Sequence, residues 1–299
     1  IVPSGLTSTN YNISFYNGTL TVNPKAATLI IDNASKTYGT TDPTFTAVAG
    51  GLYGSDTLNY TLNRASGENV GNYAITAALG SNPNYTITVT NGNLNIVQAS
   101  ASITLNDAAK VYGSADPGFT VSTNGVVSGE TLNYTLTRAA GEAVGTYVIT
   151  ATLGANPNYI VTVNNTANLT ITPQTVTMTE NSASKVYGSA DPALSATVTG
   201  LIGTDTLNYT LSRTAGETAG TYAINTALGS NPNYSVTVVD GNLTIVPKVL
   251  TVTAYSYTIA QGDPAPTFAA AITGFIPGEN EAVLGGTLSF TTAYTANSA

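Results

Sequence analysis

The strongest constraint on the fold of this chain is an internal repeat of about 75 residues. Five short motifs recur three times in the same order, which is the signature of a tandem array of one structural unit. Two of them form one block, a Tyr-Gly pair followed closely by Asp-Pro. Its copies begin at Tyr38-Gly39, Tyr112-Gly113 and Tyr187-Gly188, at intervals of 74 and 75 residues. The chain is therefore expected to fold as a series of similar small domains.

The other three motifs each contain a tyrosine. LNYTL recurs around Tyr60, Tyr134 and Tyr209. GExxGxY ends at Tyr73, Tyr147 and Tyr222, and NPNY ends at Tyr85, Tyr159 and Tyr234. These positions predict three full repeats, at residues 25–98, 99–173 and 174–247.

The two ends of the sequence resemble parts of a repeat. Residues 1–24 match its last part, and residues 248–299 match its first part, with Gln261-Gly262 in the place of Tyr-Gly. We expect a window of about four repeats that is cut inside a domain at both ends. In one explanation the window belongs to a longer covalent array. In the other, residues 1–24 of one subunit complete the sheet of residues 248–299 of the next by strand addition. The tyrosine that ends the GExxGxY motif would be missing from such a two-chain domain, which favours the covalent array.

Strand signals fill each repeat. Apolar and polar residues alternate from Tyr85 to Thr90 and from Leu58 to Asn63, and further strands are expected near 26–32, 44–49 and 72–79. Six or seven short strands in about 75 residues predict an all-β fold of tandem, small immunoglobulin-like β-sandwiches. The junctions between repeats leave almost no spare residues, so we expect an elongated rod rather than domains on flexible linkers.

The last turn of each repeat differs in length. Asn91-Gly92 in the first repeat and Asp240-Gly241 in the third are typical of a type I′ hairpin turn. The second repeat has one more residue there, which predicts an insertion in an exposed turn without a shift of strand register.

GExxGxY resembles the tyrosine corner of immunoglobulin-like sandwiches. In that device a tyrosine at the start of a strand bonds through its hydroxyl to a nearby backbone group. Tyr73, Tyr147 and Tyr222 fit this description. The simpler alternative is a turn followed by a buried tyrosine.

The composition argues against an enzyme. The chain contains no His and no Cys, so it has no Ser-His-Asp triad, thiol nucleophile or Cys/His zinc site. A net charge of −8 argues against nucleic acids and anionic membranes as partners. No apolar run is long enough to span a membrane. We predict no catalytic residues, no cofactor, no metal and no membrane contact within this window. An export signal or an anchor is expected to lie outside it.

One set of charged residues recurs in a chain in which only 8% of residues are charged. Each repeat has one Lys, Asp, Arg and Glu at matching positions: Lys36, Asp42, Arg64 and Glu68; Lys110, Asp116, Arg138 and Glu142; Lys185, Asp191, Arg213 and Glu217. The simplest interpretation is a Lys–Asp and an Arg–Glu pair that hold loops in place. The alternative is an isopeptide bond between the Lys and a facing Asp or Asn, which needs a buried Lys. The polar stretch around each Lys, next to a turn, does not favour burial.

Calcium is a second alternative for the acidic residues. Asp56, Glu130 and Asp205 follow a Gly in a loop, and Asp32, Asp107 and Glu180 lie near the repeat entries. Calcium takes six to eight oxygen ligands. Only isolated acids occur here, so no tight calcium site is expected.

The combination of KxYGxxDP, LNYTLxR, GExxGxY and NPNY resembles the MBG domain of the YGX type over nearly the whole chain. Such domains occur in tandem in large secreted bacterial surface proteins, often called adhesins. The resemblance implies an extracellular location, either on the cell surface or in a secreted filament, and a role in adhesion or surface architecture. It implies no catalytic residues. The expected function is a structural stalk or filament shaft, with neighbouring copies of the array as partners. The alternative is a multivalent module that binds surface glycans, proteins or other cells through avidity.

Overall fold

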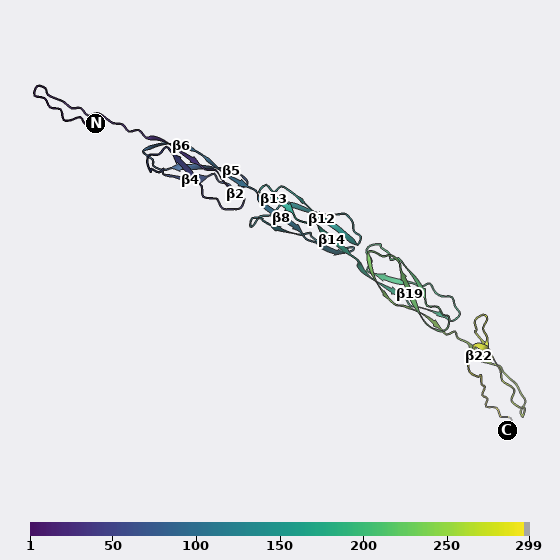
Figure 1. The fold of residues 1–299 in the computed structure, drawn as a ribbon. Coiled ribbons are helices and arrows are strands. Elements are labelled where there is room, and N and C mark those ends of the chain that lie inside the picture. Colours follow the sequence, from purple (N-terminus) through teal and green to yellow (C-terminus); the bar gives the residue numbers. More distant parts are fainter. Residues whose placement is uncertain (296–299) are drawn as a thin grey trace. The chain divides into compact units, whose positions relative to one another are not determined.

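A computed structural model describes residues 1–295, and its regular structure is almost entirely β-strand (Figure 1). Among these residues the one helix is a short 3-10 turn, η1 (Glu281–Val283). The chain divides into two compact units. The first comprises residues 1–108, 118–140 and 147–169, and the second comprises residues 109–117, 141–146 and 170 onwards. The predicted all-β class with tandem repeats is confirmed.

The first repeat contains seven strands in two sheets. The strands are β1 (Lys25–Ile31), β2 (Ala34–Thr37), β3 (Ala47–Gly50), β4 (Tyr60–Arg64), β5 (Gly71–Leu79), β6 (Tyr85–Thr90) and β7 (Gly92–Val97). One sheet has the order β3-β1-β6 and the other β2-β7-β5-β4. The pairs β1–β6 and β2–β7 are parallel, whereas the other pairs are antiparallel. The sheets of the immunoglobulin sandwich are antiparallel throughout, whereas each sheet here contains one parallel pair. The immunoglobulin-like arrangement of the strands therefore stays a prediction.

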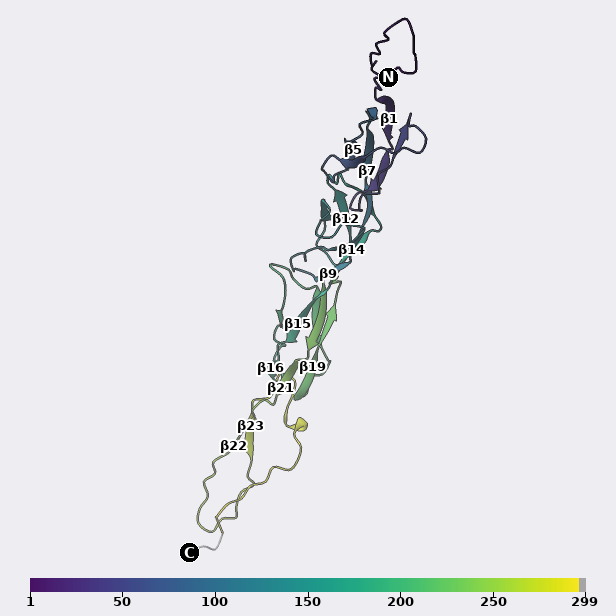
Figure 2. The same ribbon diagram turned by 90° about the vertical axis from the view of Figure 1, so that its left-hand side faces the viewer.

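The second and third repeats reproduce this order. The strands of the second are β8 (Ala99–Leu105), β9 (Ala108–Val111), β10 (Val121–Asn124), β11 (Tyr134–Arg138), β12 (Gly145–Leu153), β13 (Tyr159–Val163) and β14 (Ala167–Thr172). Those of the third are β15 (Gln174–Glu180), β16 (Ala183–Val186), β17 (Ala196–Thr199), β18 (Tyr209–Arg213), β19 (Gly220–Leu228), β20 (Tyr234–Val239) and β21 (Asn242–Val246). In the third, β21 lies between β16 and β19 (Figure 2).

The end segments are simpler. Residues 1–24 contain no strand, and residues 248–295 contain the antiparallel pair β22 (Thr251–Ala254) and β23 (Ala270–Thr273). This pair corresponds to β1 and β3 of a full repeat.

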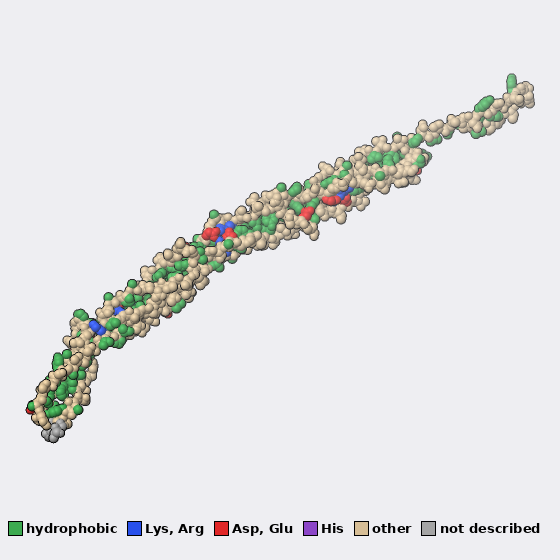
Figure 3. Space-filling model, turned by 180° about the vertical axis from the view of Figure 1, so that it is seen from behind, with side chains coloured by type: hydrophobic (Ala, Val, Ile, Leu, Met, Phe, Trp, Pro, Cys, Tyr) green, Lys and Arg blue, Asp and Glu red, His purple; other side chains and the backbone are tan. Residues whose placement is uncertain are grey.

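The core of each repeat lies between its two sheets. In the first repeat, Ile31 of one sheet packs with Ile75, Leu94 and Ile96 of the other, and all four are buried. Their strands alternate buried and exposed residues, as the sequence predicts. Full burial of one such side chain contributes roughly 1.5–3 kcal/mol. On the face drawn in Figure 3, charged side chains are few and gather in small groups among hydrophobic side chains and the backbone and remaining side chains drawn in tan.

The predicted hairpins at Asn91-Gly92 and Asp240-Gly241 are wrong. Each pair joins strands of different sheets, β6 to β7 and β20 to β21, and none of the four residues has a positive φ. Each segment is instead a crossover. Gly92 is needed because a Cβ there would lie 2.5 Å from the carbonyl oxygen of Asp32.

The insertion in the second repeat lies in the corresponding crossover between β13 and β14, and not in a hairpin turn. The side chain of Asn165 accepts a hydrogen bond from the Leu105 amide at 2.8 Å and donates one to the Leu105 carbonyl at 3.0 Å. Ala167 takes the position of Gly92 and is fully buried. The alternation of β14 continues unchanged, so the additional residue shifts no register.

Candidate functional site

The corner tyrosines make the hydroxyl bond that a tyrosine corner requires. Tyr73 donates to the Asn69 carbonyl at 2.8 Å, and Tyr222 donates to the Thr218 carbonyl at 2.8 Å. Each corner ring also carries the arginine of the recurrent charged set on its face. The guanidinium carbon of Arg64 lies 5.5 Å from the centroid of the Tyr73 ring. The corner and the charged set are thus one structure.

We expect Tyr73→Phe to lower the stability of the first repeat by about 1–2 kcal/mol, because only the hydroxyl bond is removed. The change is measured by denaturant unfolding of the full chain, with hydrogen exchange of the β5 and β7 amides as the signal from the first repeat. Tyr60→Phe is the matched control, because the Tyr60 side chain lies in β4 of the same repeat and its hydroxyl has no hydrogen-bond partner among residues 1–295. Equal stability of the two variants would exclude a structural role for the corner hydroxyl.

The recurrent charged residues of the first repeat form a closed network. The Lys36 ammonium lies 2.7 Å from Asp42 Oδ1 and also donates to Glu68. Arg64 reaches Asp42 through Nε at 2.6 Å, binds Glu68, and donates to the Gly67 carbonyl at 2.5 Å. Each carboxylate is thereby shared by both cations.

The same network recurs in the third repeat, and its lysine contacts and arginine stacking recur in the second. In the third repeat, Asp191 lies 2.7 Å from Lys185 Nζ and 2.6 Å from Arg213 Nε, and Glu217 binds both cations. In the second, Lys110 lies 2.7 Å from Asp116 and 2.5 Å from Glu142, and Arg138 stacks on Tyr147 at 5.4 Å. The predicted Lys–Asp and Arg–Glu pairs are present in the first and third repeats, joined by two further contacts each.

The lysine of each network is buried, contrary to the expectation from its polar surroundings. Lys36, Lys110 and Lys185 are each 8% exposed. The physical reason is a short strand, β2 in the first repeat, that the sequence pattern does not reveal. Its parallel pairing with β7 turns Lys36 inward, opposite the buried Ile96.

The electrostatics of the network oppose isopeptide chemistry. Hydrogen bonds from Arg64 and then Lys36 lower the pKa of Asp42 to about 2, and those to Asp42 and Glu68 raise the pKa of Lys36. The amine is therefore held protonated and the carboxyl ionised. An amide bond requires a neutral amine as nucleophile and a carboxyl that can lose an oxygen as water. The network favours an ion-pair clamp on the Tyr-Gly loop and the corner.

We expect the chain to lose stability in acid. The pKa values of Asp42 and Glu68 lie below their unfolded values of about 4, so their contribution is complete above about pH 5 and is lost as the pH falls toward 2. The raised pKa of Lys36 acts at the other end, and its contribution is lost only well above pH 10. Melting temperatures should be level from pH 6 to 9 and fall below pH 4. Asp42→Asn should reduce the loss of stability of the first repeat below pH 4. A melting temperature of the unaltered chain that rises as the pH falls from 5 to 3 would contradict the account.

The Tyr-Gly tyrosine has a different role, because it contacts the next repeat. The hydroxyl of Tyr38 donates to the Glu130 carboxylate of the second repeat, and so does the hydroxyl of Tyr159. The two rings meet edge to face, with centroids 5.4 Å apart at 82°. The Val127 amide in turn donates to the Tyr159 hydroxyl at 3.0 Å. We call the carboxylate, the NPNY tyrosine and this amide the socket, and the Tyr-Gly pair the plug.

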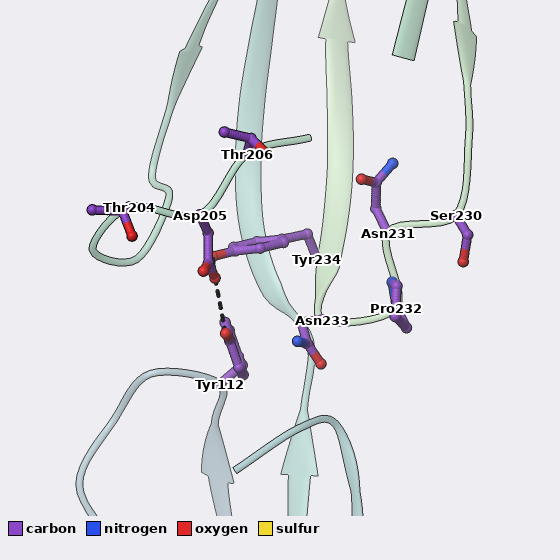
Figure 4. A pocket seen from close by; sticks show the side chains of 9 residues that line it. All are labelled: Tyr112, Thr204, Asp205, Thr206, Ser230, Asn231, Pro232, Asn233 and Tyr234. Atoms are coloured by element: carbon purple, nitrogen blue, oxygen red, sulfur yellow. Dashed lines mark hydrogen bonds between the residues drawn. The ribbon is translucent and has the colours of Figure 1, made fainter. Parts of the chain in front are cut away.

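The second plug and socket repeat these contacts (Figure 4). Tyr112 donates to Asp205 Oδ2 at 2.8 Å, and Tyr234 donates to the same oxygen at 2.5 Å. The Ile202 amide donates to the Tyr234 hydroxyl at 3.1 Å, and the rings of Tyr112 and Tyr234 are 5.4 Å apart at 81°. Shared hydrogen bonds lower the pKa of Asp205 and raise that of Tyr112.

The third plug, Tyr187, donates to Glu279 in the segment after the third repeat. Thus all three Tyr-Gly motifs bond to a carboxylate 92 or 93 residues further along the chain. The recurrent Lys, Asp, Arg and Glu bond to one another inside one repeat, whereas the Tyr-Gly tyrosine bonds to the segment that follows its repeat.

The glycine of the plug is required by close approach. Gly39 has a φ of +80°, and a Cβ there would lie 2.4 Å from Val127 Cγ2. Gly113 has a φ of +82°, and its Cβ would lie 2.6 Å from Ile202 Cγ1. The left-handed backbone and the missing side chain allow the socket's aliphatic residue to lie directly on the loop.

Side-chain amides complete each junction. Asn158 accepts from the Val70 amide at 3.1 Å, and Asn233 accepts from the Val144 amide at 3.0 Å. These residues are the second asparagine of NPNY. Gln98, the single residue between β7 and β8, donates to the Pro157 carbonyl at 3.0 Å. Each junction is therefore bonded at several points.

The sequence pattern does not identify the socket acids as partners of the plug. For Glu130 and Asp205 it suggests only a role as calcium ligands, without a tight site. Their recurrence after Gly at one repeat position was the available signal.

The other acidic residues make hydrogen bonds within their repeats. Asp107 accepts from the Asn168 amide at 2.8 Å, and Glu180 accepts from the Gly241 amide at 2.9 Å. Within residues 1–295, no three acidic side chains gather closely enough to hold a metal ion. No helix in this part of the chain has the length and apolarity needed to cross a membrane.

Comparison with known families identifies the repeated domain. The sequence model described as MBG domain (YGX type) matches residues 27–95, 101–170, 175–244 and 250–299. No curated protein matches the chain.

Proposed function

Because the chain belongs to the MBG domain family of the YGX type, we propose that it is a structural repeat segment of an extracellular surface protein. In this proposal the repeats couple in series into a stalk or filament shaft that serves adhesion or surface architecture. One observation carries it: each Tyr-Gly motif bonds to a carboxylate beyond the end of its own repeat. A repeat whose recurrent tyrosine bonds to the following segment is suited to fixing the orientation of that segment in an array.

The lengths of the junctions support a stiff coupling. One residue separates β7 from β8, and one separates β14 from β15. A Gly/Ser linker of many residues would let neighbouring domains move independently. Here the connecting backbone is short, and a hydrogen-bonded plug adds a second point of attachment beside it.

The recurrent polar loops support a structural rather than a ligand-binding role. The Asn82 side chain accepts from the Asn59 amide at 2.8 Å and donates to the carbonyls of Asn59 and Gly80. Asn156 and Asn231 make the same bonds in their repeats. Within the described residues, every buried side-chain nitrogen or oxygen has a hydrogen-bond partner. These side chains are already committed within the protein, so they favour architecture over recognition, and we propose no catalytic role.

Small-angle X-ray scattering of the full chain tests the shaft. A compact protein of 299 residues has a radius of gyration of roughly 19 Å. A shaft of four short domains, on the order of 100–150 Å long, gives roughly 30–40 Å. We expect the larger value. A value near 20 Å would contradict the proposal, and saturable binding to a glycan array would favour the multivalent binding module instead.

A further inference from the structure

Repeat 1 contains a socket built like the two that hold Tyr38 and Tyr112. The Tyr85 hydroxyl donates to Asp56 Oδ2 at 2.5 Å, and the Tyr53 amide donates to the Tyr85 hydroxyl at 3.0 Å. These are the contacts that Tyr234, Asp205 and the Ile202 amide make in repeat 3. The carboxylate, the phenol and the amide thus stand in the arrangement that receives a plug.

The socket of repeat 1 differs from the other two in its exposure. Among residues 1–295, the only tyrosine hydroxyl that bonds to Asp56 is that of Tyr85. Tyr53, which takes the place of Val127 and Ile202, is 76% exposed. In the other junctions the residue at this position lies on the glycine of a plug.

The surroundings of this socket also match a junction. Val22, Asn23 and Pro24, the residues that lead into repeat 1, line one hollow with Tyr53, Asp56 and Tyr85. A repeat ending at Pro24 would therefore end beside the socket. The same arrangement occurs between repeats 2 and 3. Repeat 2 ends at Pro173, directly before β15, and its Tyr112 binds Asp205 in the socket of repeat 3.

We propose that the socket formed by Tyr53, Asp56 and Tyr85 binds the Tyr-Gly loop of another YGX-type MBG repeat placed directly before Lys25. The tyrosine hydroxyl of that loop donates to Asp56, and its glycine lies under the Tyr53 side chain. Repeat 1 is then an acceptor for further repeats, and the array can be extended at this end. The inference rests on the proposed shaft function and adds the chemistry of its next partner.

The test places a copy of residues 174–247 directly before Lys25 of the chain, in place of residues 1–24. The seam then reads Pro247-Lys25, which keeps the Pro-Lys pair of the native junctions Pro24-Lys25 and Pro247-Lys248. The chain has no Cys, so introduced cysteines are unique labelling sites. Spin labels go on the copy's Ser184→Cys and on Ser35→Cys, which are exposed, equivalent positions in adjoining repeats. Double electron–electron resonance measures the distance between them.

The native junction supplies the reference. Labels at Ala109→Cys and Ser184→Cys report the same pair of positions across the junction of repeats 2 and 3, where Tyr112 binds Asp205. We expect the new junction to give a distance distribution as narrow as the reference. Tyr187→Phe in the copy, or Asp56→Asn, should broaden it.

Three outcomes overturn the inference, and they can be told apart. A narrow reference with a broad new junction refutes the acceptor role of repeat 1 and leaves the shaft proposal standing. A new distribution that is narrow but indifferent to both substitutions shows docking without the plug and socket. A broad reference contradicts the shaft proposal itself, and the inference falls with it.

Discussion

Replacing Gly113 with valine is expected to release repeat 2 from its contact with repeat 3. The glycine has a φ of +82°, and a side chain there meets Ile202 at 2.6 Å. Strain from the left-handed conformation alone costs of order 1–2 kcal/mol for a residue with a Cβ, and more for a β-branched one. Because the backbone fixes the position of the new Cβ, the Ile202 side chain has to move off the loop, which weakens the contact between the two repeats.

Hydrogen exchange of the Val144 amide reports this opening, because that amide donates to Asn233 across the junction. We expect its exchange to accelerate at least about tenfold, which corresponds to about 1.4 kcal/mol of lost local protection. Gly118→Val is the matched control: it lies in the same repeat, has no positive φ, and nothing lies within 4 Å of its Cβ position. Equal exchange in the two variants would show that the close approach of Gly113 does not hold the junction.

The second large effect is expected from Arg64→Ala. This substitution removes the bonds to Asp42 and Glu68, two bonds to backbone carbonyls, and the stacking on Tyr73. Removal of one partner from a buried ion pair costs about 3–5 kcal/mol. Asp42 and Glu68 keep 33% and 62% of their side-chain surface exposed, and solvent screens the charges left behind. We therefore expect a loss of about 2–3 kcal/mol in repeat 1.

Arg64→Lys distinguishes geometry from charge. A lysine keeps the positive charge, but it cannot span Asp42 and the carbonyls of the corner at once. Its loss should be intermediate. Denaturant unfolding with hydrogen exchange of β5 measures both variants in the full chain, with repeat 3 as the internal standard. If Arg64→Ala left repeat 1 as stable as before, the network would not contribute to the stability of the fold.

The sequence predicts the parts of this fold that depend on local pattern. Alternation from Tyr85 to Thr90 places β6, and the apolar positions of β1 and β5 identify core residues such as Leu29 and Ile75. The corner at Tyr73 is predicted for the same reason, since its acceptor lies four residues away. In these cases the partner of a residue is near in sequence or is fixed by strand period.

The parts that sequence reasoning missed depend on pairing between distant segments. Strand β2 has no apolar alternation and is defined by its parallel pairing with β7, which also explains the buried Lys36. The Asn91-Gly92 pair predicts a hairpin where the structure has a crossover, because such a pair says nothing about which sheet each flanking strand joins.

The plug and socket could not be paired from the repeat alone. Asp56 and Glu130 occupy the same position in successive repeats, so recurrence cannot show which of them bonds to Tyr38. The structure shows that it is Glu130, 92 residues away and in the next repeat. Periodic sequences hide contacts between repeats in this way, because a partner within the repeat and one in the next repeat recur at the same interval.

The most direct test of the account is whether Tyr112 and Asp205 act as one coupled pair. Tyr112→Phe, Asp205→Asn and the double variant are compared by hydrogen exchange of the Val144 amide. The account predicts that each single substitution accelerates exchange. Asp205→Asn should have a smaller effect once Tyr112 is already phenylalanine, since it weakens, by removing the charge, the bond that Tyr112→Phe removes. If the Asp205→Asn effect were the same in both backgrounds, or if neither single substitution changed the exchange, the Tyr-Gly motif would not couple successive repeats through this carboxylate.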